Sequence, residues 1–429
     1  MKHSGIPWIG EIPKEWELEN IGSCLKEVHD LNIDCSEDNA LQFKMGTIIS
    51  KKNGDSKYNP ETLESYNKVK CGDIVINGLN LSFDFISMRV GQVRETGVIT
   101  SAYLTIRPLP HLHSDYVTYL FKGYDVCKAL HGMGKGLRQT LSYKEFRKYL
   151  IFHPSYSEQQ KIASFLDEKC SEIDEMVVLQ EKIIEELKAY KQSVITEAVT
   201  KGLNPDVPMK DSGIEWIGEI PESWEKHPFK AFYKTTKGLN ITKDNLVEKG
   251  VPVISYGQIH SKLNTGVGVR EELIRFVPEY YLESNPECLS KQYDLFFADT
   301  SEDREGAGNI VFIDTETPIF AGYHTIIARP LEKVKSKYFA YLIKTDAWRS
   351  QIRNKVQGVK LFSISQKFLI QTYIIIPSFQ EQQEIADYLD KKCTEIDSLI
   401  NIKQSKIESL KEYKKSIIYE YVTGKKEVI

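Results

Sequence analysis

Three short stretches of the sequence contain residue types that catalysis uses, but none has a catalytic spacing. Asp167-Glu168-Lys169 has the letters of a nuclease Asp-x-Lys motif, yet it lies inside a long helical pattern, where a solvated helix face is the simpler interpretation. Gly132-Met133-Gly134-Lys135 lacks the spacing of a phosphate-binding loop and the Ser or Thr that follows its lysine. The second proline of the adenine-methylase Asn-Pro-Pro-aromatic motif is missing after Asn59-Pro60, Asn204-Pro205 and Asn285-Pro286. The sequence therefore predicts no catalytic residues.

The nine histidines and seven cysteines show no spacing typical of a metal site. No HExxH pair is present, and His111 and His113 stand at a proline-rich turn. The cysteines occur singly without a CxxC pair, so neither a disulfide framework nor a zinc ribbon is indicated. We expect reduced thiols, no metal and no cofactor bound by this chain.

Two loops, at 131–139 and 349–360, concentrate hydrogen-bond donors. Their glycines let the backbone approach a ligand closely, and Lys, Arg, Gln and Asn side chains can bind phosphates or read base edges in a major groove. For any single residue of these loops, a solvated surface is the alternative interpretation. The candidate DNA-binding residues in the two loops are Lys135, Arg138, Gln139, Arg353, Asn354, Lys355 and Lys360.

Further polar candidates occur in turns that follow short β-type runs. They share side chains that can donate to or accept from bases, and their alternative interpretation is an ordinary turn. These candidates are Asn77, Asn80, Ser82 and Arg89 earlier in the chain, and Tyr256, Gln258, Asp299, Ser301 and Arg304 later.

The elements that must position these loops belong to a duplicated chain. Ser4–Trp16 returns as Ser212–Trp224, and Pro154–Asp174 returns as Pro377–Asp397. The segments between the repeats look far less alike, and the chain begins as though it continued the linker that follows the first helical repeat. The order is therefore cyclic, which predicts a pseudo-twofold arrangement. The expected divisions are repeat segments at 1–16 and 202–224, inserts at 17–153 and 225–376, and helices at 154–201 and 377–429.

Apolar residues at steps of three and four form a matching seam along both helical repeats. A helix of this length cannot bury its stripe alone, so the matched register predicts that the two helices pack on each other in antiparallel orientation. The seam residues are Ile162, Leu166, Cys170, Ile173, Val177, Ile184 and Leu187 in the first helix, and Ile385, Leu389, Cys393, Ile396, Ile400, Ile407 and Leu410 in the second.

Both inserts have the pattern of mixed α/β domains. Short β-type runs such as 73–76 and 310–313 are separated by turns rich in Gly, Asn and Asp, and a short helix follows late in each insert. Basic residues outnumber acidic ones in each insert, whereas acidic residues predominate in 155–201. The expected fold class is α+β, with two mixed α/β domains separated by two long helices that form an antiparallel coiled coil.

Composition limits the remaining possibilities. The 429 residues are 41% hydrophobic and 27% charged, which is typical of folded domains, and the formal net charge of −4 excludes an evenly basic surface but not a local basic face. No apolar run is long enough to span a bilayer, and the first residues lack the apolar core of a signal peptide. We expect a cytoplasmic location.

The paired openings WIGEIPxxW, the paired helices PSxxEQQxIAxxLDxKCxEID and the exit VTKGLNP resemble the specificity subunits of type I restriction–modification systems. The resemblance covers essentially the whole chain. It implies that each insert is a target recognition domain that reads one half of a split DNA sequence, and that the helices set the spacer and bind modification subunits. The family's DNA-reading residues vary too much to be transferred, so the candidates above rest on loop chemistry.

The resemblance also implies the partners: double-stranded DNA, two methyltransferase subunits and restriction/translocase subunits. S-adenosylmethionine is then expected on the methyltransferase partner, and ATP and magnesium on the restriction partner. A non-catalytic coiled-coil scaffold whose inserts bind proteins is the alternative function. A nuclease that cuts by itself is disfavoured because the sequence lacks metal-binding carboxylates.

Overall fold

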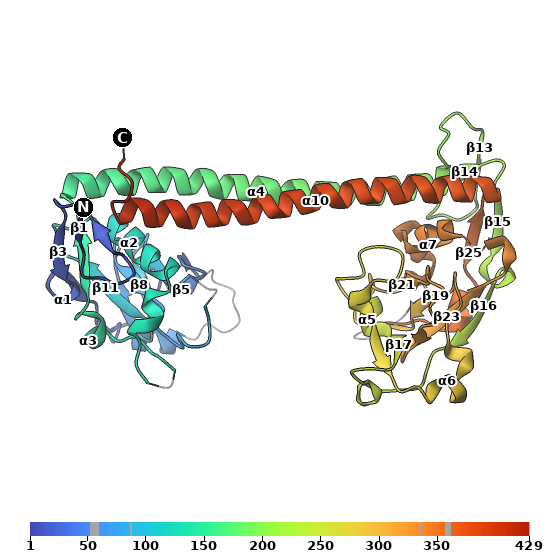
Figure 1. The fold of residues 1–429 in the computed structure, drawn as a ribbon, viewed down its shortest axis with the longest axis horizontal. Coiled ribbons are helices and arrows are strands. Elements are labelled where there is room, and N and C mark those ends of the chain that lie inside the picture. The colour runs from blue at the N-terminus through green and yellow to red at the C-terminus, as the bar shows by residue number, and fades with distance from the viewer. Residues whose placement is uncertain (52–59, 86–87, 137, 335, 357–361, 429) are drawn as a thin grey trace. The chain divides into compact units, whose positions relative to one another are not determined.

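The structure is a computed structural model that describes residues 1–51, 60–85, 88–136, 138–334, 336–356 and 362–428. Two compact units make up the chain (Figure 1). Unit 1 comprises Met1–Lys182 with Lys403–Ile429, and unit 2 comprises Ile183–Ile402. The division falls inside both long helices, so each unit contains one insert and part of each helix.

The core of unit 1 is a four-stranded sheet in the order β4-β11-β8-β9, in which all neighbours are antiparallel. Helix α2 packs on β9 and β11, and the three residues of β8 are buried because the sheet is covered. Strand β3, which directly follows the repeat segment, pairs with β12, the strand that leads into the first long helix. The strands are β1 (Lys2–His3), β2 (Glu11–Ile12), β3 (Glu17–Asn20), β4 (Leu25–Glu27), β5 (Leu41–Lys44), β6 (Thr47–Ser50), β7 (Tyr66–Val69), β8 (Ile74–Ile76), β9 (Val90–Gln92), β10 (Gly97–Thr100), β11 (Leu104–Pro108) and β12 (Leu150–His153); the short helices are α1 (Ile21–Cys24), η1 (Pro60–Ser65), α2 (Ser114–Val126), η2 (Ala129–Met133) and α3 (Tyr143–Phe146).

Unit 2 repeats this plan with the order β16-β23-β19-β21, again antiparallel throughout. A second sheet, β18-β17-β22, has no counterpart of the same order among the described strands of unit 1. The strands are β13 (Met209–Asp211), β14 (Glu219–Pro221), β15 (Glu225–Pro228), β16 (Tyr233–Lys237), β17 (Val251–Ile254), β18 (Arg275–Val277), β19 (Leu295–Ala298), β20 (Thr300–Ser301), β21 (Ile310–Phe312), β22 (Phe320–Ala321), β23 (Thr325–Pro330), β24 (Phe362–Ser363) and β25 (Tyr373–Ile376); the short helices are η3 (Phe229–Ala231), η4 (Lys243–Asn245), α5 (Tyr256–Ile259), η5 (Glu271–Leu273), α6 (Tyr281–Ser284), η6 (Pro286–Cys288), η7 (Glu332–Val334), α7 (Lys337–Lys344), α8 (Asp346–Arg353) and α9 (Gln366–Leu369).

The long helices are α4 (Tyr156–Lys201) and α10 (Phe379–Val422), and neither contains Gly or Pro. In unit 1, Phe165 meets the ring of Tyr421 at a centroid distance of 4.4 Å, and Asp174 lies 2.6 Å from Lys414 Nζ, so the two helices run antiparallel. In unit 2, Lys191 Nζ lies 2.7 Å from Asp397, which is the equivalent pair of the repeat. The α+β fold with two packed long helices is thus confirmed.

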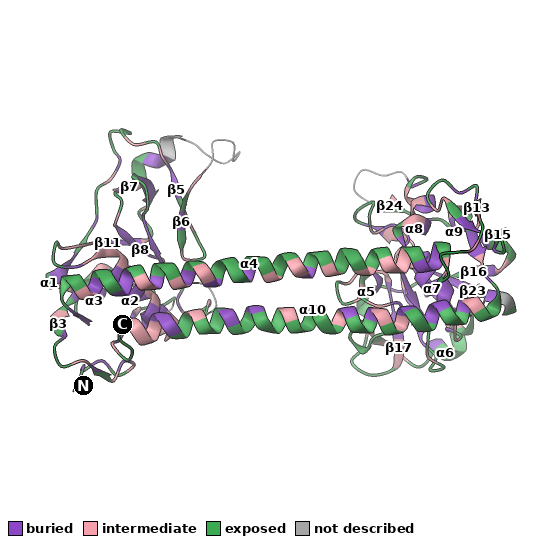
Figure 2. Cartoon of the chain, turned by 90° about the horizontal axis from the view of Figure 1, so that it is seen from above, coloured by how far each residue is buried: buried purple, intermediate pink, exposed green. Residues whose placement is uncertain are grey.

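Buried and exposed positions are interspersed along both long helices (Figure 2). Leu187 and Ile400 are half-buried, and the other predicted seam residues are buried. Buried apolar side chains at steps of three and four give each helix one face that is removed from water, which is the main stabilisation available to so long a helix.

In each unit, the opening repeat packs against the C-terminal end of a long helix from the other repeat. In unit 1, Gly424 follows α10 with φ of 66°, and a Cβ at this position would collide with Pro13 and Trp16. In unit 2, Gly202 follows α4 with φ of 79° and lies against Trp224. Only glycine combines a left-handed backbone with so close an approach. This packing is the cyclic order that the repeats predict.

The repeated tryptophans fix the start of each long helix. Trp16 Nε1 donates to Glu158 Oε1 in unit 1, and Trp224 Nε1 donates to Glu381 Oε1 in unit 2, both at 3.2 Å. The recurrence explains why the opening repeat and the helical repeat occur together. Within the described residues, no helix combines the length and apolarity needed to cross a bilayer.

Candidate nucleic-acid interface

Most candidate residues lie in or beside two equivalent loops of each unit, whereas Tyr256 and Gln258 are in the short helix α5. The first loop connects the third and fourth strands of the sheet, β8 to β9 in unit 1 and β19 to β21 in unit 2. The second loop follows the helical segment that ends at η2 in unit 1 and at α8 in unit 2. Loops supported at the same edge of a rigid sheet are the common place for recognition residues.

A backbone hydrogen bond joins the two loops at the same place in both units. Leu141 N donates to Gly78 O at 2.9 Å in unit 1, and Ile364 N donates to Asp299 O at 2.7 Å in unit 2. In unit 1, Leu81 N also donates to Gln139 O at 3.2 Å. A Cβ at Gly78 would collide with Leu141, so glycine allows this approach. The sequence analysis did not predict that the loops would pair.

In unit 1, this pairing brings the two predicted groups together. Asn77 and Ser82 are half-buried and Arg89 is buried, whereas the other predicted residues of the two loops are exposed. Asn80 and Gln139 both have left-handed backbones, with φ of 51° and 45°, which turns each loop sharply. The exposed predicted residues of unit 1 are Asn80, Lys135, Arg138 and Gln139.

Arg89 differs from the other candidates because its side chain is inside the loop. The residue is 3% exposed, and its guanidinium donates to the carbonyl oxygens of Leu79 and Asp84, each at 2.8 Å. Its backbone nitrogen donates to the buried carboxylate of Asp125 at 2.6 Å. Burial raises the pKa of that carboxyl. Arg89 therefore holds the first loop in shape rather than presenting its charge at the surface.

Two exposed aromatic rings in the same loop were missed by the sequence analysis. Phe83 is 76% exposed and Phe85 is 54% exposed, which is unusual for phenylalanine. The ring of Phe85 stacks on His131 at a centroid distance of 4.7 Å. The signal that could have found them is the stretch Asn80-Leu-Ser-Phe-Asp-Phe85, in which two aromatics stand among turn residues.

A lysine of the second loop is already paired. Lys135 Nζ lies 2.8 Å from Glu145 Oε2, and Lys148 lies 3.0 Å from the same oxygen. The two ammonium groups lower the pKa of Glu145. Because both lysines are well exposed, these ion pairs are weak and can exchange for contacts with a phosphate.

In unit 2, two predicted residues lie beside a histidine that the sequence analysis did not single out. Asp299 Oδ1 lies 3.1 Å from His324 Nδ1, and the ring of Tyr256 meets that of His324 edge-on at 5.4 Å. The His324 side chain is 58% exposed and projects from a left-handed backbone. Its signal in the sequence is the turn Gly322-Tyr-His324, in which glycine precedes two ring-bearing residues.

A second group in unit 2 joins the two loops by side chains. Arg304 donates through Nη2 to Asn354 Oδ1 at 2.9 Å and through Nε to Arg353 O at 3.0 Å. Arg353 is mostly enclosed, with its charge paired to Asp346 at 2.9 Å and to Glu305 at 3.2 Å. Arg304, Asn354 and the neighbouring Lys355 are exposed.

The remaining candidates of unit 2 are less accessible. Gln258 accepts from Ser255 N at 3.1 Å in a capping box, and Ser301 is 3% exposed in the β20–β24 pair. Lys360 lies outside the described residues. Arg349, from α8, donates to Ala307 O at 3.2 Å, and burial lowers its pKa to about 10. It supports the first loop from beneath.

Comparisons with known proteins bear on both units. Residues 221–412 match the family model of the type I restriction modification DNA specificity domain. The type I restriction enzyme MjaVIII specificity subunit of Methanocaldococcus jannaschii is 24% identical over 421 residues, covering 96% of this chain and 93% of the relative. The putative MjaX specificity subunit of the same organism is 24% identical, with 97% and 95% covered. Over nearly its whole length, the chain is thus similar to type I restriction–modification specificity subunits.

Solved structures share the fold of this chain. A chain described under "Structural basis underlying complex assembly and conformational transition of the type I R-M system" matches with a TM-score of 0.71 and 14% identity, covering 96% of this chain and 99% of that chain. The HsdS subunit from Thermoanaerobacter tengcongensis matches with a TM-score of 0.55 and 14% identity over 99% and 100%.

Proposed function

We propose that the chain is the specificity subunit of a type I restriction–modification system, and that each unit reads one half of a bipartite DNA target through its paired loops. The observation that carries the proposal is a hydrogen bond that recurs in both units, from Leu141 to Gly78 and from Ile364 to Asp299. In each unit it holds the second loop against the first, next to the equivalent four-stranded sheet, although the loop sequences differ between the units. A common support with different side chains is what two readers of different half-sites require. The recognition domains are assigned to 17–153 and 225–376.

The exposed side chains in these loops suit the chemistry of a duplex. Arg138, Arg304 and Lys355 can donate to phosphates or to guanine, and Asn and Gln side chains can pair with adenine. Each well-formed bidentate contact contributes about 1 to 3 kcal/mol of discrimination, so a few contacts in each half select a rare site. The modest net charge of the two inserts predicts a weak phosphate grip by this chain alone.

We also propose that the long helices dock methyltransferase subunits and set the spacer between half-sites. Exposed apolar residues recur at equivalent positions of the repeat: Met176 and Leu179 with Tyr413 in unit 1, and Leu399 and Ile402 with Tyr190 in unit 2. Solvent-exposed apolar side chains that recur in this way favour two copies of one partner. S-adenosylmethionine would be bound by the methyltransferase, and ATP and magnesium by the restriction subunit.

Duplex binding with and without the partner tests the proposal. The isolated chain should bind duplex DNA weakly, and adding methyltransferase subunits should give tight binding that depends on sequence and falls with salt. Nanomolar specific binding by the isolated chain would contradict the role assigned to the partner. Assembly without any salt-sensitive duplex binding would favour the scaffold function instead.

A further inference from the structure

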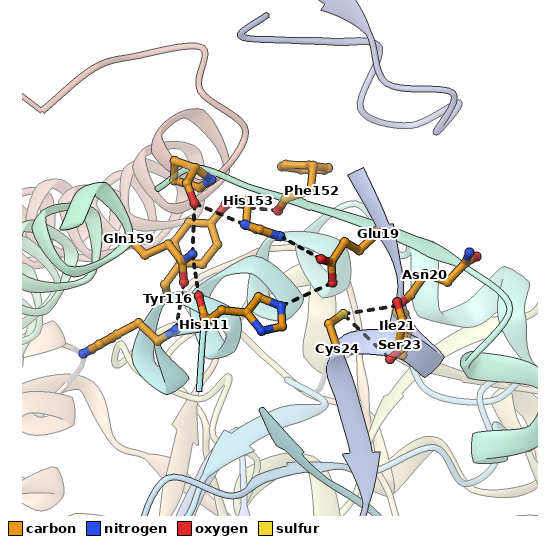
Figure 3. A network of polar contacts seen from close by, with 12 residues as sticks. Glu19, Asn20, Ile21, Ser23, Cys24, His111, Tyr116, Phe152, His153 and Gln159 are labelled. Atoms are coloured by element: carbon orange, nitrogen blue, oxygen red, sulfur yellow. Dashed lines mark hydrogen bonds and ion pairs between the residues drawn. The ribbon is translucent and has the colours of Figure 1, made fainter. Parts of the chain in front are cut away.

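Three side chains that are distant in the sequence meet in unit 1, away from the paired loops. Glu19 comes from β3, His153 ends β12, and His111 precedes α2. Their ligand atoms all lie within 4.8 Å of one another, and Figure 3 shows both imidazoles directed toward the carboxylate. The sequence analysis predicts no metal site, because local spacing cannot reveal ligands that only the fold brings together.

The hydrogen bonding of His153 is the informative feature of this cluster. The residue is 5% exposed, and its Nδ1 lies 3.1 Å from Pro154 O. Its Nε2 has no hydrogen-bond partner among the described residues, and Glu19 Oε1 lies 3.9 Å away. In the tautomer that donates from Nδ1, the Nε2 lone pair faces a carboxylate oxygen; in the other tautomer, the Nδ1 lone pair faces the carbonyl. Either neutral form therefore leaves an electron pair directed at an oxygen.

A cation bound to His153 Nε2 would remove the repulsion between this electron pair and the oxygen. The same cation would also be bound by Glu19 and His111. His111 Nε2 lies 3.3 Å from Glu19 Oε2. Two ligands bound to one tetrahedral zinc ion at about 2.0 to 2.1 Å are roughly 3.4 Å apart, so this pair already has the separation of zinc ligands. Nitrogen and carboxylate ligands of this kind suit zinc and similar divalent ions, whereas magnesium and calcium prefer oxygen alone.

We propose that Glu19, His111 and His153 bind one zinc-class divalent cation, with an open position for water. The hydrogen bond from His153 Nδ1 to Pro154 O would fix the ring so that Nε2 faces the ion, as the outer partners of metal-bound histidines do. The partial exposure of His111, whose side chain is 45% exposed, gives the ion a path to the site.

The position of the site indicates what the ion does. The site connects three elements: β3, which follows the repeat segment, the turn before α2, and β12, which runs into α4. The same junction is fastened by Gln159, whose Nε2 donates to His111 O at 3.2 Å and to Pro154 O at 3.0 Å. The ion would hold the first recognition domain firmly on the start of its helix.

The second repeat supplies a natural contrast. There the β15–β25 pair carries His227 at the place of Glu19, and Ile376 at the place of His153. His227 Nε2 lies 2.8 Å from Glu225 Oε2, and no group of three potential ligands was found among the described residues of unit 2. One chain should therefore bind one ion, in unit 1.

Titration of untagged, chelator-treated full chain with Co²⁺ and Zn²⁺ tests the proposal. We expect one equivalent of Co²⁺ with visible absorption typical of a tetrahedral site, displacement by Zn²⁺, and a higher midpoint of thermal unfolding with Zn²⁺ present. His111→Ala, which changes a partly exposed turn residue, and Glu19→Gln should each weaken binding by at least about tenfold. His29→Ala, which removes an exposed histidine outside the cluster, should bind like the wild type.

Two results would overturn the proposal. One is the absence of Co²⁺ binding at micromolar concentrations. The other is binding that survives His111→Ala and Glu19→Gln with unchanged affinity and stoichiometry. Because neither measurement requires DNA or a methyltransferase, failure here is distinguishable from failure of the proposed function.

Discussion

Arg329 and Asp294 form a bidentate ion pair within the sheet of unit 2. Arg329 Nη2 donates to Asp294 Oδ2 at 2.8 Å and Nε donates to Oδ1 at 3.1 Å, while the aspartate has no exposed surface. In unit 1, Arg107 donates to both oxygens of Asp73 at 2.6 and 2.7 Å. The same pair thus ties the second strand of each sheet to the turn before the third.

Replacing Arg329 with methionine should destabilise unit 2 substantially. The change leaves Asp294 buried without its partner, which costs about 3 to 5 kcal/mol in comparable buried pairs. Urea unfolding of the full chain measures the loss. Arg270→Met is the matched control, because Arg270 and Glu272 form an exposed pair that contributes little to stability. Equal effects of the two substitutions would show that the sheet does not depend on this pair.

The stability of unit 2 should depend on pH through Lys344. This lysine is enclosed by the loop at Asn264, whose Oδ1 accepts from its Nζ at 2.9 Å, and burial lowers its pKa to about 7. Between this value and its ordinary value near 10.5, the unfolded chain holds more protons than the folded chain. The contribution of Lys344 to stability is therefore lowest below pH 7 and rises with pH, by at most about 1.4 kcal/mol per unit.

Urea unfolding of the wild type and of Lys344→Met between pH 6 and about 9 measures this dependence. The stability difference between the two proteins should change steadily across the range in favour of the wild type. A difference that stays constant would mean that Lys344 keeps its ordinary pKa when folded.

Single loop substitutions should affect one half of the DNA target only. Arg138→Ala removes an exposed donor from unit 1, and Lys355→Ala removes one from unit 2. If either residue contacts a base, its loss should relax the preference at one position by about 1 to 3 kcal/mol and leave the other half-site unchanged. Sequencing of methylated sites made by the reconstituted methyltransferase reads both halves at once. Relaxation of both halves by one substitution would contradict separate readers.

Introducing a charged residue on the exposed face of a long helix should prevent the binding of one partner subunit. Leu179→Asp in unit 1 and Ile402→Asp in unit 2 each place a carboxylate at one of the equivalent apolar positions. Each variant should retain one methyltransferase subunit and the double variant none, as measured by the mass of the complex in solution. Ser405→Asp, at an exposed polar position of α10, is the control and should assemble fully. Full assembly of the double variant would place the docking surface elsewhere.

Much of the framework was predictable because it depends on local patterns. The helices α4 and α10 follow from apolar steps of three and four, and their pairing follows from repeats that share one register. The segment Gly72-Asp73-Ile74-Val75 is also weakly similar to Tyr293-Asp294-Leu295-Phe296, which fits the strand order that the two sheets share. These features depend on periodicity and duplication, and both can be read without coordinates.

The paired loops and the histidine cluster could not be predicted in the same way. The bond from Leu81 to Gln139 and the meeting of Glu19 with His111 depend on how distant strands pair, and no local spacing encodes them. Arg89 illustrates the same limit. Its residue type suggests a DNA contact, whereas the fold places its guanidinium among backbone carbonyls.

Exchange of one recognition domain tests the central claim most directly. Residues 17–153 are replaced by the corresponding insert of another type I specificity subunit whose target is known, and the methylated sites are sequenced in cells that express the matching methyltransferase. The account predicts a bipartite motif in which one half becomes that of the donor and the other half is unchanged. A motif that changes in both halves, or one that is indifferent to the exchange, would contradict it.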